Sequence, residues 1–346
     1  MQKLSVIQWA TGKVGELSLR AIMDDPRLEL VGVYVYSADK VGRDAGDLCG
    51  RPACGVAATN DLDELLLLDA DVVVYTPFLA DVPQVIRLLE SGVDVISTNL
   101  FANVGGIQGD VRNRLAAACE RGGSSLHVTG VHPGWANSIA VSLTGICRRV
   151  ERVSLFESAD CSEYESAETW LSLGMSMPDA TAEVKAVAQI SLQSFADATQ
   201  KMAEALAFKL DELRFCVEFA KAAERVDLGW LCMEKGTIAA IRGGWDGVVN
   251  GRTVVQTRVA WYLTDKLDTD WEFDDDHYHV VVDGDPGVEC RIRFISQEYW
   301  GANETLISTA LPAVNAIFNV NAAASGILTL PDVGIVTAPA GILPEN

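Results

Sequence analysis

The sequence predicts an α/β fold with two parts, a doubly wound N-terminal domain on a parallel sheet and an α+β C-terminal domain with a mainly antiparallel sheet. Three observations favour this fold class. The chain opens with a strand, a glycine turn, a helix and a second strand; strands then alternate with helices to about residue 130; and runs with a period of two residues follow. A length of 346 residues suits two domains.

The first elements form a βαβ unit. Leu4–Trp9 is an apolar run typical of a buried parallel strand, and apolar residues recur at helical spacing from Gly15 to Met23. Asp25-Pro26 ends this helix, and Leu28–Tyr36 is a second β-rich run. Helices and strands are then predicted to alternate at Leu62–Leu68, Asp71–Tyr75, Val82–Ser91, Val93–Ser97, Arg112–Arg121 and Ser125–Val131.

The alternation stops after about Trp135. Residues 181–207 form a long Ala-rich helical region, and Thr253–Leu263 and residues 277–295 show the period-2 pattern of antiparallel strands. The sequence Gly-Asp-Pro-Gly at 284–287 predicts a hairpin turn. We expect a dinucleotide-binding domain at 1–135, a substrate and dimerisation domain at 136–305, and a C-terminal helix and tail at 306–346 that return to the first domain.

Charge and composition limit the partners of the protein. A formal net charge of −21 and a pI near 4.5 disfavour nucleic acid and anionic membrane surfaces, which both favour an excess of Lys and Arg. Neither a signal peptide nor a membrane span is expected, so we expect a cytoplasmic protein. The eight cysteines are expected to be reduced thiols, since the closest pair, Cys49 and Cys54, lacks Cys-x-x-Cys spacing.

The turn after the first strand is a candidate phosphate-binding site. In "WATGKVG", Gly12 and Gly15 have the spacing of the second and third glycines of the dinucleotide fingerprint, and Ala10 stands where the first usually lies. The N–H groups at the start of the helix would then bind a diphosphate. An ordinary tight βα turn is the alternative. The predicted binding residues are Ala10, Thr11, Gly12, Lys13, Val14 and Gly15.

The end of the second strand indicates which dinucleotide is bound. An acid there binds a free ribose 2′-hydroxyl, whereas cations bind a 2′-phosphate. The strand ends in Tyr36-Ser37 without an acid, and Lys40 and Arg43 follow. Ser37, Lys40 and Arg43 are therefore predicted to bind a 2′-phosphate, which favours NADP while leaving NAD possible. The alternative is that both cations are solvated loop charges.

Two further strand ends meet the same edge of the predicted sheet. Ligands of open α/β sheets bind outside the carboxyl ends of the strands. The residues expected to flank the ribose and nicotinamide are Tyr75, Thr76 and Pro77 after one strand and Thr98 and Asn99 after the next. These residue types are also common in ordinary turns, which is the alternative interpretation.

Candidate residues for proton transfer lie in two clusters. His132 follows the sixth strand, where an imidazole can donate or accept a proton, and Trp135 beside it is a candidate apolar wall for a substrate. Tyr164 and Glu165 are candidates for a proton donor and an amine-binding carboxylate, with Trp170 narrowing the pocket. The alternatives are a histidine held in a Pro-Gly turn, and a polar loop with one buried aromatic residue.

Metal chemistry is not expected. His277 and His279 lie two residues apart on one predicted strand, but no third ligand has suitable spacing. A solvated strand face is the simpler interpretation of this pair. We therefore predict no catalytic metal.

The motifs together resemble a known superfamily. "VIQWATGKVG", "YSADKVGRDAGDL", "DVVVYTP", "TGVHPGW" and "ALPAVNAI", in this order, are similar to the dihydrodipicolinate reductase-like superfamily, above all to the branch of 2,4-diaminopentanoate dehydrogenase and the native NAD(P)H-dependent amine dehydrogenases. This resemblance implies a Rossmann domain joined to an α/β domain that dimerises, a substrate bound between them, and hydride transfer at a carbon bearing an amine, imine or carbonyl.

One departure from the branch concerns its amination chemistry. The resemblance implies a Glu just after the strand that ends in "VIST", but residues 99–103 read Asn-Leu-Phe-Ala-Asn. Phe101 is instead a candidate substrate contact. We expect an NAD(P)H-dependent oxidoreductase acting on a small apolar substrate, as a homodimer. A cyclic imine or enamine reductase and a non-catalytic dinucleotide sensor are the alternatives.

Overall fold

A computed structural model describes residues 3–100, 107–274, 277–295 and 304–339. Within these residues the chain forms two units. The first unit takes in 1–135 and 303–346, and the second takes in 136–302. The C-terminal segment thus belongs with the N-terminal residues.

The first unit contains a parallel sheet of seven strands. Their order is β15-β6-β5-β4-β1-β2-β3, and every pair of neighbours is parallel. The order reverses direction between β1 and β4, which is where dinucleotide-binding sheets place their ligand. The strands are β1 (Leu4–Trp9), β2 (Leu28–Tyr34), β3 (Ala58–Thr59), β4 (Val72–Tyr75), β5 (Asp94–Ser97), β6 (Ser125–Val128) and β15 (Gly326–Ile327).

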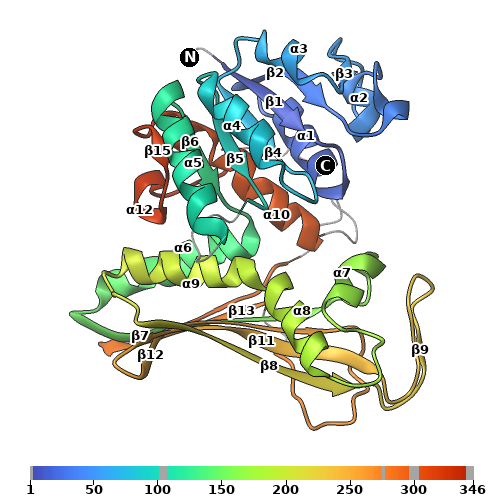
Figure 1. Ribbon diagram of the computed structural model, residues 1–346, viewed down its shortest axis with the longest axis vertical. Helices are drawn as coiled ribbons and strands as arrows, with labels where there is room; N and C mark the ends of the chain where they lie inside the picture. The colour runs from blue at the N-terminus through green and yellow to red at the C-terminus, as the bar shows by residue number, and fades with distance from the viewer. Residues whose placement is uncertain (1–2, 101–106, 275–276, 296–303, 340–346) are drawn as a thin grey trace, which may run out of the picture. The chain divides into compact units, whose positions relative to one another are not determined.

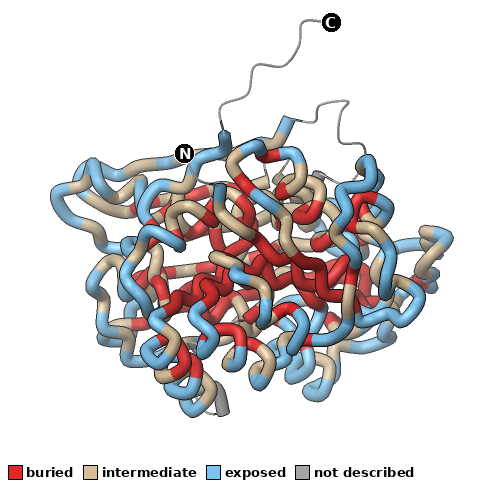
Figure 2. The backbone as a smooth tube through the Cα atoms, turned by 90° about the horizontal axis from the view of Figure 1, so that it is seen from above, coloured by how far each residue is buried: buried red, intermediate tan, exposed pale blue. Residues whose placement is uncertain are grey.

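Helices cover both faces of this sheet (Figure 1). Alternate residues of β1 face opposite sides: Val6 packs with α10 and α11, whereas Ile7 and Trp9 pack with α3, α4 and α5. The strands of this sheet are mostly buried, and buried residues lie in the middle of the view in Figure 2, with exposed segments around them. The helices are α1 (Lys13–Asp24), α2 (Ala45–Cys49), α3 (Leu62–Leu66), α4 (Val82–Glu90), α5 (Ile107–Gly122), α10 (Glu304–Asn315), α11 (Ile317–Asn321) and α12 (Leu330–Val333), with a 3₁₀ turn η1 (Ala38–Lys40).

The second unit contains a sheet of six strands in the order β14-β13-β7-β12-β11-β8. Only the β7–β12 pair within it is parallel. The strands are β7 (Arg149–Asp160), β8 (Glu212–Lys221), β11 (Ile238–Val249), β12 (Arg252–Tyr262), β13 (Tyr278–Asp285) and β14 (Val288–Ile292), and a small ribbon joins β9 (Val226–Asp227) to β10 (Cys232–Met233). The helices are α6 (Ala136–Ser142), α7 (Ala167–Ser172), α8 (Ala182–Ser191) and α9 (Gln193–Ala205).

Helix α9 packs on one face of the second sheet, against β11 and β12. The indole Nε1 of Trp245 on β11 donates to the carbonyl oxygen of Leu192 at 2.8 Å, just before α9. The hydroxyls of Thr199 and Thr257 are 2.6 Å apart and join α9 to β12. Residues of the opposite parity on these strands point to the other face of the sheet.

The predicted fold class is confirmed, and most predicted elements of the first unit lie within two residues of their observed bounds. Three predicted elements of the chain, one of them in the second unit, differ from the structure by more than this. The region 181–207 is two helices, because the chain leaves helical geometry at Leu192. In the first unit, β6 ends at Val128 rather than Val131, and α5 begins at Ile107, five residues before the predicted start at Arg112.

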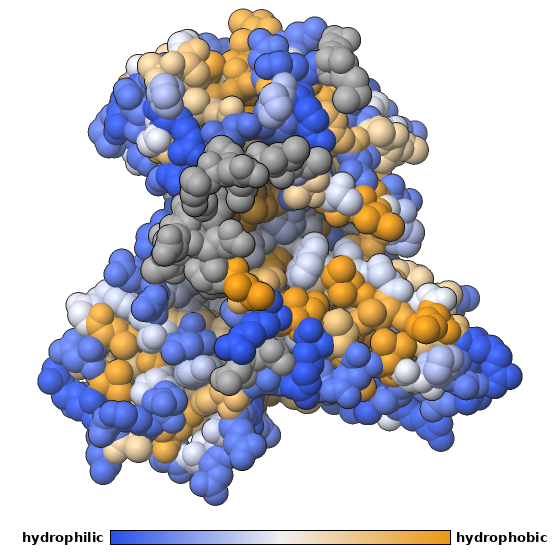
Figure 3. Space-filling view, turned by 180° about the vertical axis from the view of Figure 1, so that it is seen from behind, coloured by the Kyte–Doolittle hydropathy of each residue, from blue (hydrophilic) through white to orange (hydrophobic). Residues whose placement is uncertain are grey.

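Hydrophilic side chains dominate the outer edges of the second unit in the view of Figure 3.

All eight cysteines are free. Among the described helices, none combines the length and the hydropathy that crossing a bilayer requires.

Candidate functional site

The turn between β1 and α1 has an unusual backbone. Ala10 adopts a φ of 71°, a left-handed conformation that glycine adopts more easily. A Cβ built on Gly15 would lie 2.2 Å from the carbonyl oxygen of Ala10 and 2.8 Å from Thr76 Oγ1. Gly15 therefore lets the first turn of α1 lie directly on the end of β1.

Neither the backbone conformation nor the packing around Gly12 requires a glycine at this position. Its φ is −74°, which any residue adopts, and a Cβ built there would meet nothing within 4 Å. Gly12 is the N-cap of α1 and makes no side-chain capping bond, whereas α2, α3 and α4 are each capped by an aspartate. The N-terminus of α1 thus combines an uncapped helix dipole with open space, which suits an anion.

Two buried polar side chains, Gln8 and Thr76, hydrogen-bond to the backbone of the turn and of the strand before it. Gln8 on β1 donates from Nε2 to the carbonyl oxygen of Ala10 and to Thr76 Oγ1, both at 2.9 Å. Thr76 in turn donates to the carbonyl oxygen of Trp9 at 3.0 Å. Thr76, predicted as a cofactor contact, therefore has its hydroxyl engaged in supporting the turn. Gln8 was not predicted, although a glutamine inside an apolar strand is itself a signal.

Lys40 lies against the same turn. Its Nζ donates to the carbonyl oxygen of Thr11 at 2.8 Å and approaches Thr11 Oγ1 at 3.1 Å. Ser37 is exposed at the N-cap of η1. The structure thus brings Lys40, but not Ser37, into contact with the glycine turn.

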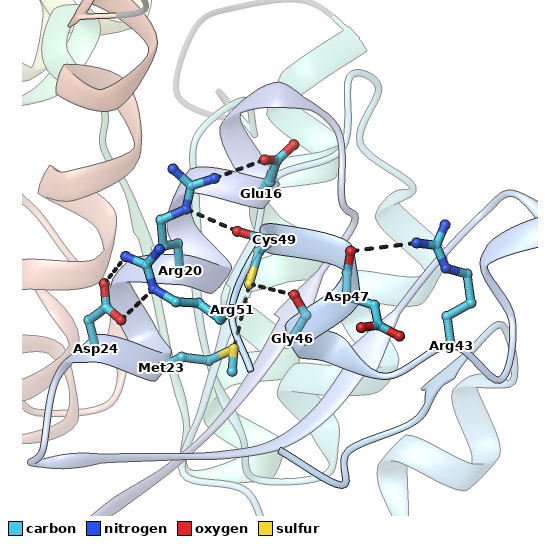
Figure 4. A network of polar contacts seen from close by, with 9 residues as sticks. All are labelled: Glu16, Arg20, Met23, Asp24, Arg43, Gly46, Asp47, Cys49 and Arg51. Carbon is cyan, nitrogen blue, oxygen red and sulfur yellow. Dashed lines mark hydrogen bonds and ion pairs between the residues drawn. The ribbon is translucent and has the colours of Figure 1, made fainter. Parts of the chain in front are cut away.

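Arg43 is an exposed cation beside α2 (Figure 4). Its Nη2 lies 3.5 Å from the carbonyl oxygen of Asp47, a weak contact with a neutral group. The neighbouring Arg20 and Arg51 are instead paired with the carboxylates of Glu16 and Asp24. Among the arginines drawn in Figure 4, Arg43 alone keeps its charge without a carboxylate partner.

Aromatic residues gather at the carboxyl ends of β1, β2 and β4. The rings of Trp9 and Tyr34 stack at 3.9 Å, and Trp9 Nε1 donates to the hydroxyl of the exposed Tyr36 at 3.1 Å. Tyr75 is fully buried, and its hydroxyl accepts from the backbone N–H of Asp81 at 2.9 Å. Burial raises the pKa of Tyr75. The side chain of Tyr75 is therefore a core residue, and the unpredicted Tyr36 is the exposed aromatic of this cluster.

The other strand-end residues form a hydrogen-bonded corner. The N–H of Thr98 donates to the carbonyl oxygen of Tyr75 at 3.2 Å, and Asn99 Nδ2 donates to the carbonyl oxygen of Pro77. This arrangement joins the ends of β4 and β5. Phe101 lies outside the described residues.

His132 and Trp135 follow β6 in the first unit. Both are half-buried, and the N–H of Trp135 donates to the carbonyl oxygen of Gly130 at 2.8 Å. Gly134 between them has a φ of 144°, and a Cβ there would lie 2.7 Å from Thr129 Oγ1. The backbone of this segment is a tight turn that belongs to the first unit.

Tyr164 and Trp170 pack together in the second unit. Their rings meet edge to face at 5.6 Å, and Trp170 Nε1 donates to the carbonyl oxygen of Tyr164 at 2.9 Å. Burial raises the pKa of Tyr164. Trp170 is buried and also contacts Trp261 at 6.0 Å, while Glu165 is exposed. Trp170 is thus placed to hold Tyr164, and Tyr164 keeps its proton at neutral pH.

A buried ion pair on α9 was not predicted. Lys201 Nζ lies 3.1 Å from Asp197 Oδ2, with side chains only 10% and 1% exposed respectively. An Asp and a Lys four residues apart inside an Ala-rich apolar helix were the signal available in the sequence.

The strand histidines are engaged in ordinary contacts. His277 Nδ1 accepts from the N–H of Phe294 at 3.2 Å, and His279 Nε2 lies 2.9 Å from Glu289 Oε1. Within the described part of the chain, no three His, Cys, Asp or Glu side chains are grouped as metal ligands would be.

Comparisons with known proteins relate the chain to reductases and dehydrogenases. Residues 6–95 match the family described as dihydrodipicolinate reductase, N-terminus. An amine dehydrogenase of Streptomyces virginiae is 27% identical over 355 aligned positions, which cover 95% of this chain and 96% of that protein. The structure of an amine dehydrogenase from Mycobacterium smegmatis has a TM-score of 0.75 at 17% identity and covers 97% of both chains. GenD2 of gentamicin A biosynthesis, solved with NAD, has a TM-score of 0.53 at 16% identity, covering 96% of this chain and 90% of that one.

Proposed function

We propose that this NAD(P)-dependent oxidoreductase is a member of the dihydrodipicolinate reductase-like superfamily, because residues 6–95 match that family and 95% of the chain aligns with an amine dehydrogenase. We further propose that it reduces an imine or carbonyl carbon of a small apolar molecule, or catalyses the reverse oxidation. When bound, the nicotinamide group supplies or accepts the hydride. The protein has to bind the dinucleotide, orient the substrate, exclude water and manage one proton.

The β1–α1 turn is the proposed diphosphate site. The observation that carries this proposal is the position of Gly12. It lies at the N-terminus of α1, which no side chain caps, and open space surrounds it, so that no contact within the protein requires a glycine there. The N–H groups of the residues that follow Gly12 would bind phosphate oxygens, and Gly15 and Thr76 keep α1 against β1. The backbone residues assigned to this site are Ala10, Thr11, Gly12, Lys13, Val14 and Gly15.

NADP is the proposed preferred cofactor. Lys40 is fixed at the glycine turn, and the exposed Arg43 has no carboxylate partner among the described residues. With Ser37, these side chains would bind a 2′-phosphate by charge-assisted hydrogen bonds. Titration of wild type and Arg43→Ala with both reduced cofactors tests this assignment. We expect the variant to lose NADPH affinity and to keep NADH affinity; unchanged NADPH affinity would show that Arg43 is a solvated charge.

The proposed substrate carbon bears a nitrogen or an oxygen. A relative that covers 95% of this chain is an amine dehydrogenase, which favours an amine or imine, yet residues 99–103 contain no acid to take a proton from ammonium. We therefore favour a ketone or a preformed imine over direct amination. Turnover of a ketone panel with and without ammonium decides: a rate that requires ammonium contradicts this preference.

Tyr164 is the proposed proton donor, because its hydroxyl keeps its proton at neutral pH and Trp170 packs against its ring and bonds to its backbone. His132 and Glu165 are the further candidates, and the buried pair of Lys201 and Asp197 joins them. Phe101 and Trp135 are proposed to contact the apolar part of the substrate, together with Trp170. Single substitutions at each candidate, compared by kcat and KM, rank their contributions.

The proposed assembly is a homodimer formed by the second unit, as in the superfamily that the sequence resembles. Light scattering coupled to gel filtration measures the mass directly. We expect twice the chain mass of 37.2 kDa. A monomer at micromolar concentration contradicts the proposal.

A further inference from the structure

The second unit contains a cavity on the sheet face opposite to α9. Its volume is about 490 Å³. Strands β7, β8, β11 and β12 form its floor, and residues that follow β12 form one wall. All of its lining residues belong to the second unit.

The register of the strands explains the cavity. Ala260 on β12 lies between Ser158 on β7 and Arg242 on β11. Arg258, two residues earlier on β12, faces the same side beside Phe156. A small side chain surrounded by larger ones leaves a hollow in the sheet face.

Two buried polar atoms at this hollow have no hydrogen-bond partner among the described residues. They are Arg258 Nη1 and Ser158 Oγ. Arg258 Nη2 donates to Asp246 Oδ1 at 2.7 Å, so one edge of the guanidinium is satisfied and the other is not. Buried donors without partners are rare in folded proteins, and each one calls for a ligand or water.

A second guanidinium is fixed beside them. Arg242 Nη2 donates to the carbonyl oxygen of Glu272 at 2.5 Å, and its guanidinium lies 4.3 Å from the ring centre of Trp271. These contacts orient the side chain without neutralising its charge. The cavity therefore offers two oriented cations, and among the described residues only Arg258 of these two is paired with a carboxylate.

The acidic residues of the lining limit the charge of a ligand. The Glu157 side chain lies on the α9 face, where it accepts from Trp261 Nε1 at 2.7 Å. On the cavity side, Asp274 is paired with Arg291 at 2.5 Å, and Glu218 and Glu272 are exposed. Three carboxylates, those of Glu218, Glu272 and Asp274, around two guanidinium groups disfavour a doubly charged phosphate. A group with one negative charge and two acceptor oxygens matches the two donors.

We propose that this cavity binds a small organic carboxylate. One carboxylate oxygen accepts from Arg258 Nη1 and the other from Ser158 Oγ, while Arg242 supplies a second positive charge. Phe156 and Ala260 contact the apolar part of the ligand. The proposal does not depend on the function proposed above, because every residue in it lies in the second unit and none belongs to the dinucleotide site.

Calorimetric titration of the full-length protein with pyruvate, butyrate and inorganic phosphate, without dinucleotide, tests the proposal. We expect pyruvate or butyrate to bind at one site per chain and phosphate to give no heat. Ser158→Ala should weaken carboxylate binding about fivefold and Arg242→Gln about tenfold. Ser154→Ala is the matched control, a buried serine on the same face of β7 outside the cavity, and should bind like wild type.

Fluorescence provides a second readout, since Trp271 stacks on Arg242. We expect carboxylate to change the tryptophan emission of wild type but not of Trp271→Phe. No carboxylate heat in wild type, or equal affinity in wild type and Ser158→Ala, overturns the proposal. One further outcome would also overturn the proposal. If wild type binds no carboxylate and the Arg242→Gln variant dissociates into monomers, the cavity is occupied by a second copy of the chain and not by a carboxylate.

Discussion

Lys40 Nζ donates to the carbonyl oxygen of Thr11 at 2.8 Å and so joins the segment after β2 to the glycine turn after β1. The two residues are 29 positions apart in the sequence. This contact places a positive charge at the turn where Gly12 leaves open space. The loop proposed to select the dinucleotide and the turn proposed to bind its diphosphate are therefore joined by a direct contact.

The first prediction concerns Lys40. Lys40→Met should weaken NADPH binding about tenfold, which corresponds to about 1.4 kcal/mol, because a charge-assisted contact is lost. NADH binding should weaken less, since NADH lacks the 2′-phosphate. Fluorescence titration of both reduced cofactors measures this, and Lys3→Met, an exposed lysine before β1, is the control. Equal losses for NADPH and NADH would assign Lys40 to the turn alone.

The second prediction separates the two glycines of the turn. Gly15→Ala should reduce the unfolding free energy by about 3 kcal/mol, because its Cβ would overlap the backbone of Ala10. Gly12→Ala should cost only about 1 kcal/mol or less, since nothing lies near its Cβ and only the preference of the N-cap for glycine over alanine is lost. Urea unfolding without cofactor measures both. Similar losses in the two variants would contradict the described turn.

Much of this turn was predictable from local sequence, and the reasons are local. The apolar run of β1, the spacing of Gly12 and Gly15, and the helical periodicity of α1 each depend on neighbouring residues. The left-handed backbone of Ala10 was not predictable, because alanine disfavours positive φ and adopts it here within the packed β1–α1 turn. The same applies to Gln8, whose partners include Thr76, 68 residues away.

The second unit was less predictable because its features depend on long-range pairing. The cavity around Ala260 arises from the register of β7, β11 and β12, and no local pattern specifies which strands are neighbours. The break at Leu192 was missed because leucine favours helices, whereas its carbonyl oxygen here accepts from Trp245. The burial of Lys201 likewise follows from the packing of α9.

The third prediction concerns acid stability. Asp25 follows α1, and hydrogen bonds from the Arg27 side chain hold the pKa of its carboxyl below the ordinary 3.8. A lowered pKa stabilises the fold above the unfolded-state value, and this stabilisation is lost as the pH falls through the lower folded-state value. Urea unfolding from about pH 5 to about pH 2 should therefore show a smaller acid loss for Asp25→Asn than for wild type. Parallel curves would show that Asp25 contributes nothing to the acid transition.

The fourth prediction concerns Tyr164. Tyr164→Phe should reduce kcat about 100-fold on any ketone or imine that the enzyme reduces, because a positioned proton donor is lost. Since burial raises the pKa of Tyr164 above its ordinary 10.0, wild-type activity should not decline through its ionisation until the pH exceeds that value. Tyr262→Phe, a tyrosine of β12 outside the proposed proton-transfer group, is the control. Activity within threefold of wild type in Tyr164→Phe would transfer the role to His132, Glu165 or Lys201.

The central claim is that the turn at Gly12 binds the diphosphate of a nicotinamide dinucleotide. Calorimetric titration of NADPH and NADH into wild type and Gly12→Asp tests it most directly, because the open space accepts the aspartate while its charge repels a diphosphate. We predict saturable heat at one site per chain in wild type and at least a hundredfold weaker binding in a folded Gly12→Asp variant. No heat with either cofactor in wild type, or equal binding by the variant, would contradict the claim.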